Sequence, residues 1–536
     1  MSESNSSSVK ASGNESTSLN ELVPLIQRHV DALKKPGVVS IRPGYRMENG
    51  WPTKERAVVV IRSKDATGLS FPSELEGVKV DVREATPVEQ MRHGEPERFA
   101  KLAAERPELV PGAFPEVDPV AEGAAAPQPT IAPAAAKPQI AYTPAPVPLQ
   151  AVRGNLSFTC HASPDAGWPT LKQFLSQTQS RLTVGLYDWT SEHILNEVKK
   201  NFALGQVLKI TLDNPALNPT ADQSDSDTVK TLDQALGGSF EAAWALVRQN
   251  KDIARWIFPT AYHIKVAVRD GKSVWLSSGN WNNSNQPDID PISNPQADDQ
   301  QIARKSDRDW HVIVDNPDLA QTYEAYLKHD FDVADAVAPA TGPGLQEVTP
   351  PEPVPAEFQV EARAAFHFFA PLRLENEAAT ITPLLTPDPG VYQEAMLKLI
   401  QSAENKLYIQ LQYIHPSDSA QDASFTDLIN AVVDRNSKGV DVRIILSQFQ
   451  ASHGWLERLQ AAGIDLSTVK IQNGVHNKGF VVDSTTVALG SQNWSGDGVL
   501  RNRDASLIIE NAKAAQYYEN IFLHDWDNLA RQSVRQ

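Results

Sequence analysis

The chain is 536 residues long and 41% of its residues are apolar, which is enough for several domains with packed cores. Its formal net charge is −17, and residues 151–536 carry 32 Lys and Arg against 47 Asp and Glu, hence −15 of that charge. Proteins that hold long nucleic acids present a basic face, because neutralisation of phosphates supplies most of their affinity. This charge therefore argues against a nucleic-acid partner. The single cysteine, Cys160, excludes an internal disulfide and a cysteine metal cluster, and we interpret it as a small buried apolar residue.

Residues 1–18 are rich in Ser and Asn and are predicted to be disordered. They lack the order of basic and then apolar residues that marks a secretory signal. No run of about 18 apolar residues, the length that spans a bilayer, occurs anywhere in the sequence. We therefore expect a cytoplasmic protein by default, and export by a route that needs no N-terminal signal stays compatible with the sequence.

Residues 19–90 are predicted to form a small α/β module. Apolar residues recur at helical spacing over residues 19–34, and Ser18 is a suitable N-cap. Three apolar runs typical of short strands follow, at residues 38–42, 56–62 and 77–83. The module contains no catalytic constellation, so we interpret it as an accessory domain whose partner the sequence leaves open.

Two proline-rich stretches, residues 105–150 and 341–358, divide the rest of the chain. Proline at this density forbids helices and sheets and gives an extended spacer. The stretches separate two globular segments, residues 151–340 and 359–536.

These two segments are internal repeats. Each begins with a turn, an amphipathic helix and a strand, from Ser163 in the first and from Thr386 in the second. A fixed offset of 195 aligns the ends of the repeats, at the pairs Asp309 and Asp504, His329 and His524, and Asp330 and Asp525. Strands that alternate with helices predict an α/β sandwich for each repeat.

One polar pattern occurs in each repeat with identical spacing. It consists of His263, Lys265, Asp270, Ser278 and Asn280 in the first repeat, and of His476, Lys478, Asp483, Ser491 and Asn493 in the second. His and Lys two residues apart on a strand share one face, because strand side chains alternate, so the residue between them points away. A turn and a second strand then bring Ser and Asn beside them.

These residue types suit phosphodiester chemistry. Lysine supplies a full charge for phosphate oxygens, and Asn and Ser donate neutral hydrogen bonds to them. Histidine is left to attack phosphorus or to move protons. Two copies that face each other supply a nucleophile and an acid for the leaving oxygen, so the expected site needs no metal and no other cofactor.

The duplicated pattern resembles the HxKxxxxDxxxxxxGSxN signature of the phospholipase D superfamily, over about residues 155–536. The second copy matches in full, and the first carries Ser277 where the signature has Gly. The resemblance implies two α/β sandwich repeats packed around a pseudo-two-fold active site, with the small N-terminal module added to them.

The resemblance also implies roles for the motif residues. His263 is the expected nucleophile and His476 the expected acid and base. An acidic residue about eleven positions after the motif Asn orients a motif histidine in this superfamily, and this position falls on Asp504 in the second repeat. Asp309 takes the same role by repeat alignment. The motif aspartates Asp270 and Asp483 are expected to stabilise turns.

Several other features have two interpretations. The Asp- and Asn-rich segment 281–301 is either a metal site or a solvated loop, and its spacing favours the loop. His329 and His524 are interpreted as structural. Five aromatic residues near the motif strands either line a pocket for a choline-type cation or pack in the core: Tyr187, Trp189, Trp281, Tyr413 and Trp494.

The leading hypothesis is a phosphodiesterase of the phospholipase D type. It would hydrolyse the headgroup of a glycerophospholipid to phosphatidic acid, or transfer it to another alcohol, through a phosphohistidine. A nuclease is the first alternative, and the acidic charge argues against it. A cardiolipin-synthase-like phosphatidyltransferase is the second, and such enzymes usually carry membrane spans that this sequence lacks. A scaffold without activity would require broken motifs, and both motifs are intact.

Overall fold

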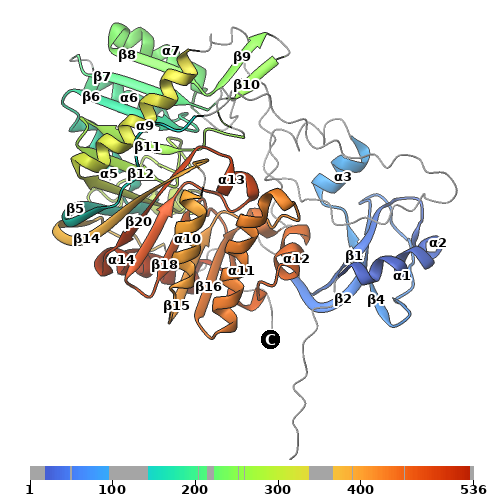
Figure 1. Ribbon diagram of the computed structural model, residues 1–536. Coiled ribbons are helices and arrows are strands. Elements are labelled where there is room, and N and C mark those ends of the chain that lie inside the picture. Colours follow the sequence, from blue (N-terminus) through green and yellow to red (C-terminus); the bar gives the residue numbers. More distant parts are fainter. Residues whose placement is uncertain are drawn as a thin grey trace, which may run out of the picture. The chain divides into compact units, whose positions relative to one another are not determined.

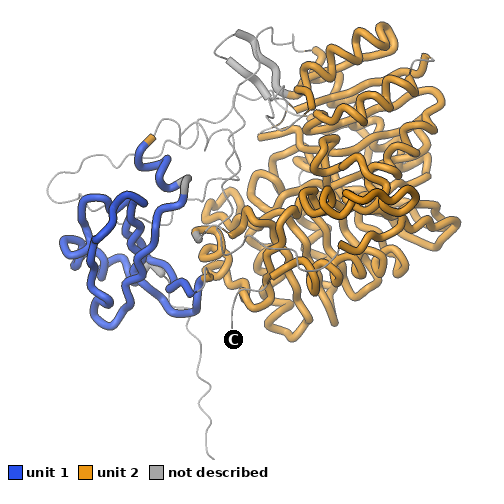
Figure 2. Tube along the Cα trace, turned by 180° about the vertical axis from the view of Figure 1, so that it is seen from behind, with its two compact units in different colours: residues 1–48, 52–94, 113–128 blue, residues 49–51, 95–112, 129–536 orange. Residues whose placement is uncertain are grey.

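The computed structural model describes residues 19–48, 51–95, 143–202, 205–213, 222–250, 253–256, 258, 260–336, 366–388, 390–451 and 453–531. The predicted disorder of residues 1–18, the cap at Ser18, the linker 341–358 and most of the linker 105–150 lie outside these ranges. The chain divides into two compact units, shown in Figure 2. The first comprises residues 1–48, 52–94 and 113–128, and the second comprises residues 49–51, 95–112 and 129–536.

The first unit is a small α/β module, as predicted for this region. Its strands are β1 (Val38–Glu48), β2 (Trp51–Arg62), β3 (Glu74–Leu75) and β4 (Val78–Glu84), in the sheet order β1-β2-β4-β3. Its helical segments are a 3₁₀ turn (Leu19–Leu22), α1 (Val23–Arg28), α2 (Val30–Leu33) and α3 (Pro87–Gly94). The single helix predicted over residues 19–34 is therefore wrong. Pro24 is the second residue of α1, where its missing N–H leaves no helical hydrogen bond unmade, and the helix is interrupted again at His29.

The second unit is built on one continuous sheet of 14 strands (Figure 1). The strand order is β17-β16-β15-β18-β19-β20-β14-β5-β13-β12-β11-β6-β7-β8. The first repeat supplies β5 (Val152–Ser163), β6 (Arg181–Leu186), β7 (Val207–Leu212), β8 (Phe240–Trp244), β11 (Lys265–Arg269), β12 (Ser273–Ser277) and β13 (Asp309–Asp315). The second supplies β14 (Leu372–Thr386), β15 (Lys406–Leu411), β16 (Asp441–Ser447), β17 (Val469–Gln472), β18 (Lys478–Val482), β19 (Thr486–Gly490) and β20 (Asp504–Glu510).

The strand order is symmetric about its centre. β14 and β5 pair there as antiparallel neighbours, and moving outward from them meets equivalent strands of the two repeats. The two predicted sandwiches therefore share a single sheet. A separate hairpin, β9 (Leu246–Asn250) and β10 (Ile253–Trp256), lies outside this sheet.

Helices cover both faces of the sheet and give three layers. One face packs against α9 (Pro317–Asp335) and α14 (Ala512–His524). The other packs against α5 (Gly167–Ser176), α6 (Glu192–Phe202), α7 (Asp225–Leu236), α10 (Val391–Gln401), α11 (Ala423–Ser437), α12 (His453–Ala461) and α13 (Gly496–Leu500). The strands alternate accordingly: Val312 and Val314 of β13 face the first core, and Ile313 faces the second.

This architecture is the predicted pair of α/β sandwich repeats. Cys160 of β5 is free and fully buried, and burial raises the pKa of its thiol to about 12. Among the described residues, no helix has the length and apolar character needed to cross a bilayer.

Candidate active site

Both copies of the motif lie at one end of the sheet strands. In the first repeat, Lys265 opens β11, His263 lies two residues before that strand, and Asn280 follows the end of β12. β11 pairs with β12 in antiparallel register, so the start of the first strand meets the end of the second. Lys478 and Asn493 take the same places at β18 and β19.

Backbone hydrogen bonds between the repeats join the two copies. The N–H of His263 donates to the carbonyl of Arg503 over 2.8 Å, and the N–H of His476 donates to the carbonyl of Arg308 over 3.1 Å. Short bridges between Tyr262 and Arg503, and between Arg308 and Val475, accompany these bonds. The backbone of each motif histidine is therefore held by the residue that directly precedes β20 or β13 of the other repeat.

Each histidine is also paired with the aspartate of the other repeat. Nδ1 of His263 lies 2.8 Å from Oδ1 of Asp504, and Nδ1 of His476 lies 3.0 Å from Oδ1 of Asp309. The aspartates open β20 and β13 and are fully buried. Both were predicted to orient motif histidines, and the pairing across the repeats is what the structure adds. Nε2 of each ring is the nitrogen that can face a substrate, and Nε2 of His476 lies 3.2 Å from Nζ of Lys478.

The motif serines support these aspartates. Ser278 Oγ donates to Asp309 over 2.7 Å, and Ser491 Oγ donates to Asp504 over 2.5 Å. In this structure each serine hydroxyl therefore supports an aspartate, and its donation to a phosphate stays a prediction.

The two lysines are buried and lie within the same electrostatic cluster. Lys265 Nζ and Lys478 Nζ each donate to the carbonyl of the motif histidine two residues earlier, over 2.5 Å. Burial lowers the pKa of Lys478 to about 8, against the opposing effect of Asp309 and Asp504. Burial also lowers the pKa of Lys265 well below its ordinary value. An anion that binds between the lysines would stabilise their charged forms.

Burial keeps both catalytic candidates neutral. It lowers the pKa of His263 to about 3, with Lys265 adding to this effect and Asp504 opposing it. It lowers the pKa of His476 to about 4, with Lys478 adding to the effect and Asp309 opposing it. A neutral ring whose Nδ1–H is held by a carboxylate presents the lone pair of Nε2, the form that a nucleophile or a base requires.

The motif asparagines each contribute a buried side-chain oxygen to which no described protein group donates a hydrogen bond. Among the residues that the structure describes, Oδ1 of Asn280 and Oδ1 of Asn493 are buried and have no hydrogen-bond partner. A buried polar atom without a partner costs about 1–3 kcal/mol, which a ligand can recover. These oxygens accept hydrogen bonds, so they can take one from a hydroxyl group or a water molecule in the site, whereas phosphate oxygens require the Nδ2–H donors of the same amides.

Comparison with known proteins identifies the superfamily of the chain. The sequence profile of a family described as "Cardiolipin synthase, PLD-like domain" matches residues 396–526. The "Phospholipase D" of Rickettsia conorii is 29% identical over 156 residues, which cover 29% of this chain and 71% of that protein. The chain belongs to the phospholipase D superfamily. It is a phosphodiester-acting enzyme of that superfamily.

Other relatives carry different names. "Mitochondrial cardiolipin hydrolase" of Xenopus tropicalis is 31% identical over 105 residues, which cover 19% of this chain and 50% of that protein. Among solved structures, phosphatidylserine synthase of Haemophilus influenzae Rd KW20 is 12% identical and has a TM-score of 0.44, covering 70% of this chain and 89% of its own.

The departure from the superfamily signature at Ser277 has a structural reason. Ser277 Oγ contacts Nδ1 of His311 over 2.6 Å and accepts from the N–H of Gly279 over 2.8 Å. In the second repeat the equivalent of His311 is Ser506, and a Cβ added to Gly490 would lie 1.8 Å from its Oγ. The two positions therefore differ together: the first repeat has Ser277 beside His311, and the second has Gly490 beside Ser506.

The motif aspartates lie at the opposite ends of the strands from the histidines. Asp270 and Asp483 sit in turns with φ of 55° and 50°, and each accepts from three backbone N–H groups of the loop before β6 or β15. The pKa of each carboxyl is lowered overall. Burial acts to raise it, and the hydrogen bonds from the backbone outweigh that effect. Neither aspartate contacts the histidines. His329 and His524 lie on α9 and α14, also outside the site.

The aromatic residues divide between core and site. Trp189, Trp281 and Trp494 are fully buried in the cores. The Tyr187 ring lies 5.0 Å from that of His263, and Lys265 Nζ lies 5.2 Å from its centroid. Tyr413 stacks on His415, with the ring centroids 4.0 Å apart. Within the described part of the chain, including segment 281–301, no group of three or more His, Cys, Asp and Glu side chains could hold a metal ion.

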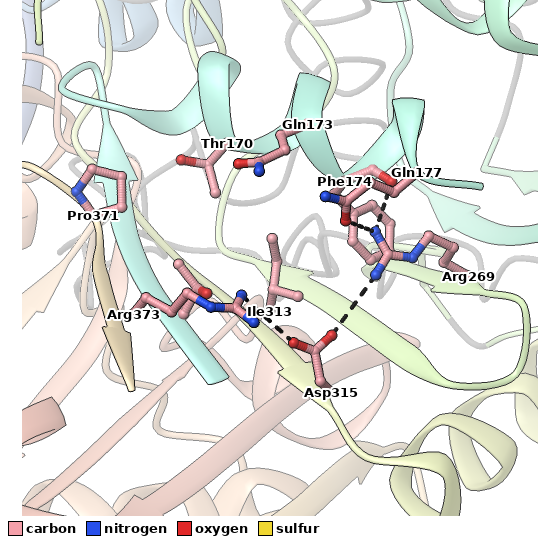
Figure 3. Close-up of a pocket in the computed structure, with 10 residues that line it drawn as sticks. Thr170, Gln173, Phe174, Gln177, Arg269, Ile313, Asp315, Pro371 and Arg373 are labelled. Carbon is pink, nitrogen blue, oxygen red and sulfur yellow. Dashed lines mark hydrogen bonds and ion pairs between the residues drawn. The ribbon is translucent and has the colours of Figure 1, made fainter. Parts of the chain in front are cut away.

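A cavity of about 510 Å³ lies apart from this cluster (Figure 3). Arg269 and Arg373 flank Asp315 there, at the far ends of β11 and β13 from the motif. The guanidinium of Arg269 already donates hydrogen bonds to the carbonyl of Phe174 and to the side chain of Gln177, so protein groups rather than a ligand satisfy it. We assign it no part in the chemistry.

Proposed function

We propose that this enzyme is a metal-independent phospholipase D that cleaves the headgroup ester of glycerophospholipids through a phosphohistidine. The observation that supports this most directly is the pair of reciprocal contacts, His263 with Asp504 and His476 with Asp309, which joins two motif copies in one buried cluster. The cluster holds two neutral imidazoles, two lysines and the side-chain amides of two asparagines. These groups neutralise and orient a phosphodiester without a metal ion.

The first step is attack of His263 Nε2 on phosphorus. A P–N bond forms, the P–O bond to the headgroup alcohol breaks, and His476 gives its proton to the leaving oxygen. Binding of the anionic phosphodiester beside His476 raises the pKa of that ring, so it can carry this proton. Asp504 stabilises the positive charge that develops on His263.

The second step reverses the roles of the groups. His476, now neutral, takes a proton from water, whose oxygen attacks phosphorus while the P–N bond to His263 breaks. Phosphatidic acid leaves with retained configuration, because phosphorus is inverted twice. A primary alcohol in place of water gives headgroup exchange.

The charge of the catalytic repeats favours a lipid over a nucleic acid. Residues 151–536 carry a net charge of −15, and such a field repels a long polyanion. A zwitterionic phospholipid presents one phosphate and a cation, so the repulsion is absent. We therefore propose phosphatidylcholine or phosphatidylethanolamine as the substrate class, presented at a lipid surface.

Product analysis tests this proposal. Purified protein would be incubated with mixed micelles of each phospholipid in dilute ethanol, and separately with DNA and RNA, with the His263→Ala variant as the blank. Phosphatidylethanol and free headgroup are the expected products. Rapid degradation of DNA or RNA without release of any headgroup would instead assign the enzyme as a nuclease. Cardiolipin formation from phosphatidylglycerol would assign it as a phosphatidyltransferase.

A further inference from the structure

Two arginines precede the aspartates that orient the histidines, and both are fully buried. Arg308 stands before Asp309, and Arg503 stands before Asp504. Lysine and arginine side chains are almost never fully buried unless they are paired. Their partners therefore indicate what these arginines do.

The partners of Arg308 come from both repeats. Its guanidinium contacts Asp165, in the loop after β5, and makes a double contact with Asp525 after α14, with Nε–Oδ2 at 2.8 Å and Nη2–Oδ1 at 3.0 Å. Both carboxylates are fully buried. Asp165 belongs to the first repeat and Asp525 to the second, so Arg308 bridges them.

Arg503 makes the mirror arrangement. Its Nη2 contacts Asp330 of the first repeat at 2.7 Å, and its Nη1 lies 3.5 Å from Asp388 of the second. Nη1 also donates to the carbonyl of Thr386 over 3.0 Å. The repeat symmetry therefore extends to a complete set of one arginine and two aspartates on each side.

A chain of hydrogen bonds leads from the Arg308 set to the motif itself. Asp525 accepts from Gln410 Nε2 over 2.9 Å, and Gln410 Oε1 accepts from Asn477 Nδ2 over 3.1 Å. Asn477 is the residue between His476 and Lys478, and its Oδ1 accepts from the N–H of Trp310, next to Asp309, over 3.3 Å. The chain thus links the strand of the histidine to the strand of its aspartate.

We propose that Arg308 and Arg503 are positioning residues for the catalytic histidines of the opposite repeats. Each arginine fixes the backbone whose carbonyl accepts from the histidine N–H and whose next residue is the orienting aspartate. Arg308 thereby acts on His476, and Arg503 acts on His263. The inference rests on the proposed function for its kinetic consequence, but its geometric content stands independently.

The test compares four variants of the full chain. Arg308→Met and Arg503→Met remove the bridges. A triple variant, Arg308→Met with Asp165→Asn and Asp525→Asn, removes the buried carboxylates that Arg308→Met leaves uncompensated. Arg181→Met is the matched control, because Arg181 pairs with Glu324 between β6 and α9, away from both histidines. Thermal unfolding, kcat and KM on the soluble diester bis(4-nitrophenyl) phosphate, and the mass of the intact protein after rapid quenching are measured for each.

The kinetic results should separate the two arginines. A displacement of about 1 Å at a catalytic group costs roughly 10²-fold, so kcat should fall by about that factor in both single variants with KM little changed. Arg308→Met should accumulate the phosphohistidine adduct, because His476 activates water, whereas Arg503→Met should form it slowly. The triple variant should recover stability but not kcat. Wild-type kcat in a folded Arg308→Met protein, or an equal loss in Arg181→Met, would overturn the inference.

A second readout does not require turnover. The Nδ1 proton of His476, held against Asp309, should give a low-field proton resonance in NMR spectra that Arg181→Met retains and Arg308→Met loses. Retention of this resonance in Arg308→Met would overturn the inference even if no substrate is found. Absence of turnover in the wild-type protein, with loss of the resonance in Arg308→Met, would count against the proposed function alone.

Discussion

Replacement of Asp504 by Asn should slow formation of the phosphohistidine without unfolding the protein. Asn keeps the size of the side chain and an oxygen that can accept from Ser491, but it removes the negative charge next to His263. That charge lies on a buried oxygen 2.8 Å from His263 Nδ1. It stabilises the cation that forms on the ring when Nε2 bonds to phosphorus.

The magnitude follows from Coulomb's law. With the charge centres about 4 Å apart and an effective dielectric constant of about 20, the interaction is worth about 4 kcal/mol. Each 1.36 kcal/mol is a factor of ten, so the rate of the first step should fall roughly 10³-fold. The deficit should appear in kcat, because a neutral ring in the ground state gains little from Asp504.

The assay is single-turnover kinetics on bis(4-nitrophenyl) phosphate, in which release of the first nitrophenolate reports formation of the P–N bond. Asp483→Asn serves as the control, since Asp483 accepts from backbone N–H groups at the far ends of the strands. That variant should lower the melting temperature and leave the rate of a folded enzyme unchanged. A rate within threefold of wild type for Asp504→Asn would show that the reciprocal pairing has no catalytic role.

Three further predictions concern the same cluster. Replacement of His263 or His476 by Ala should each remove activity by roughly 10²–10⁴-fold or more, and the double variant should be little worse, because the groups act as a unit; full activity in either single variant, measured on the soluble diester, would rule out the two-copy mechanism. Hydrolysis of that diester should persist in excess EDTA, because Lys265 and Lys478 supply the charge that a metal would; loss on chelation, restored by one divalent ion, would contradict this. The free energy of unfolding should decline as pH falls from about 6.5 towards 4. Burial lowers the pKa of His311 and His476 to about 4 and that of His263 to about 3. Over this pH range the histidines of the unfolded chain therefore bind protons, whereas those of the folded chain stay neutral. Each histidine contributes about 1.4 kcal/mol per pH unit in this window, and Asp307, whose pKa is raised to about 6 by burial, offsets about one of them; a melting temperature that is constant from pH 6.5 to 4.5 would refute this reasoning.

The sequence by itself showed the repeat and predicted the phosphodiester chemistry. Side chains on a strand alternate, so the spacing of His263 and Lys265, repeated at His476 and Lys478, was enough to predict two basic faces on rigid strands. The same periodicity predicted the α/β sandwiches that the structure has. The resemblance to the phospholipase D superfamily, together with the repeat alignment, implied that Asp309 and Asp504 orient histidines.

Only the tertiary structure decided which residues meet across the repeats. No spacing in the sequence states that Asp504 binds His263, which lies 241 positions earlier, because that contact depends on how the sheets join through β5 and β14. Arg308 and Arg503 stand at equivalent places in the two repeats, but their partners lie in the opposite repeats, Asp525 directly after α14 and Asp330 within α9, and meet them only when the two halves pack. The serines illustrate the same limit: their residue type predicted a hydrogen-bond donor, and only the structure shows that Ser278 and Ser491 donate to Asp309 and Asp504.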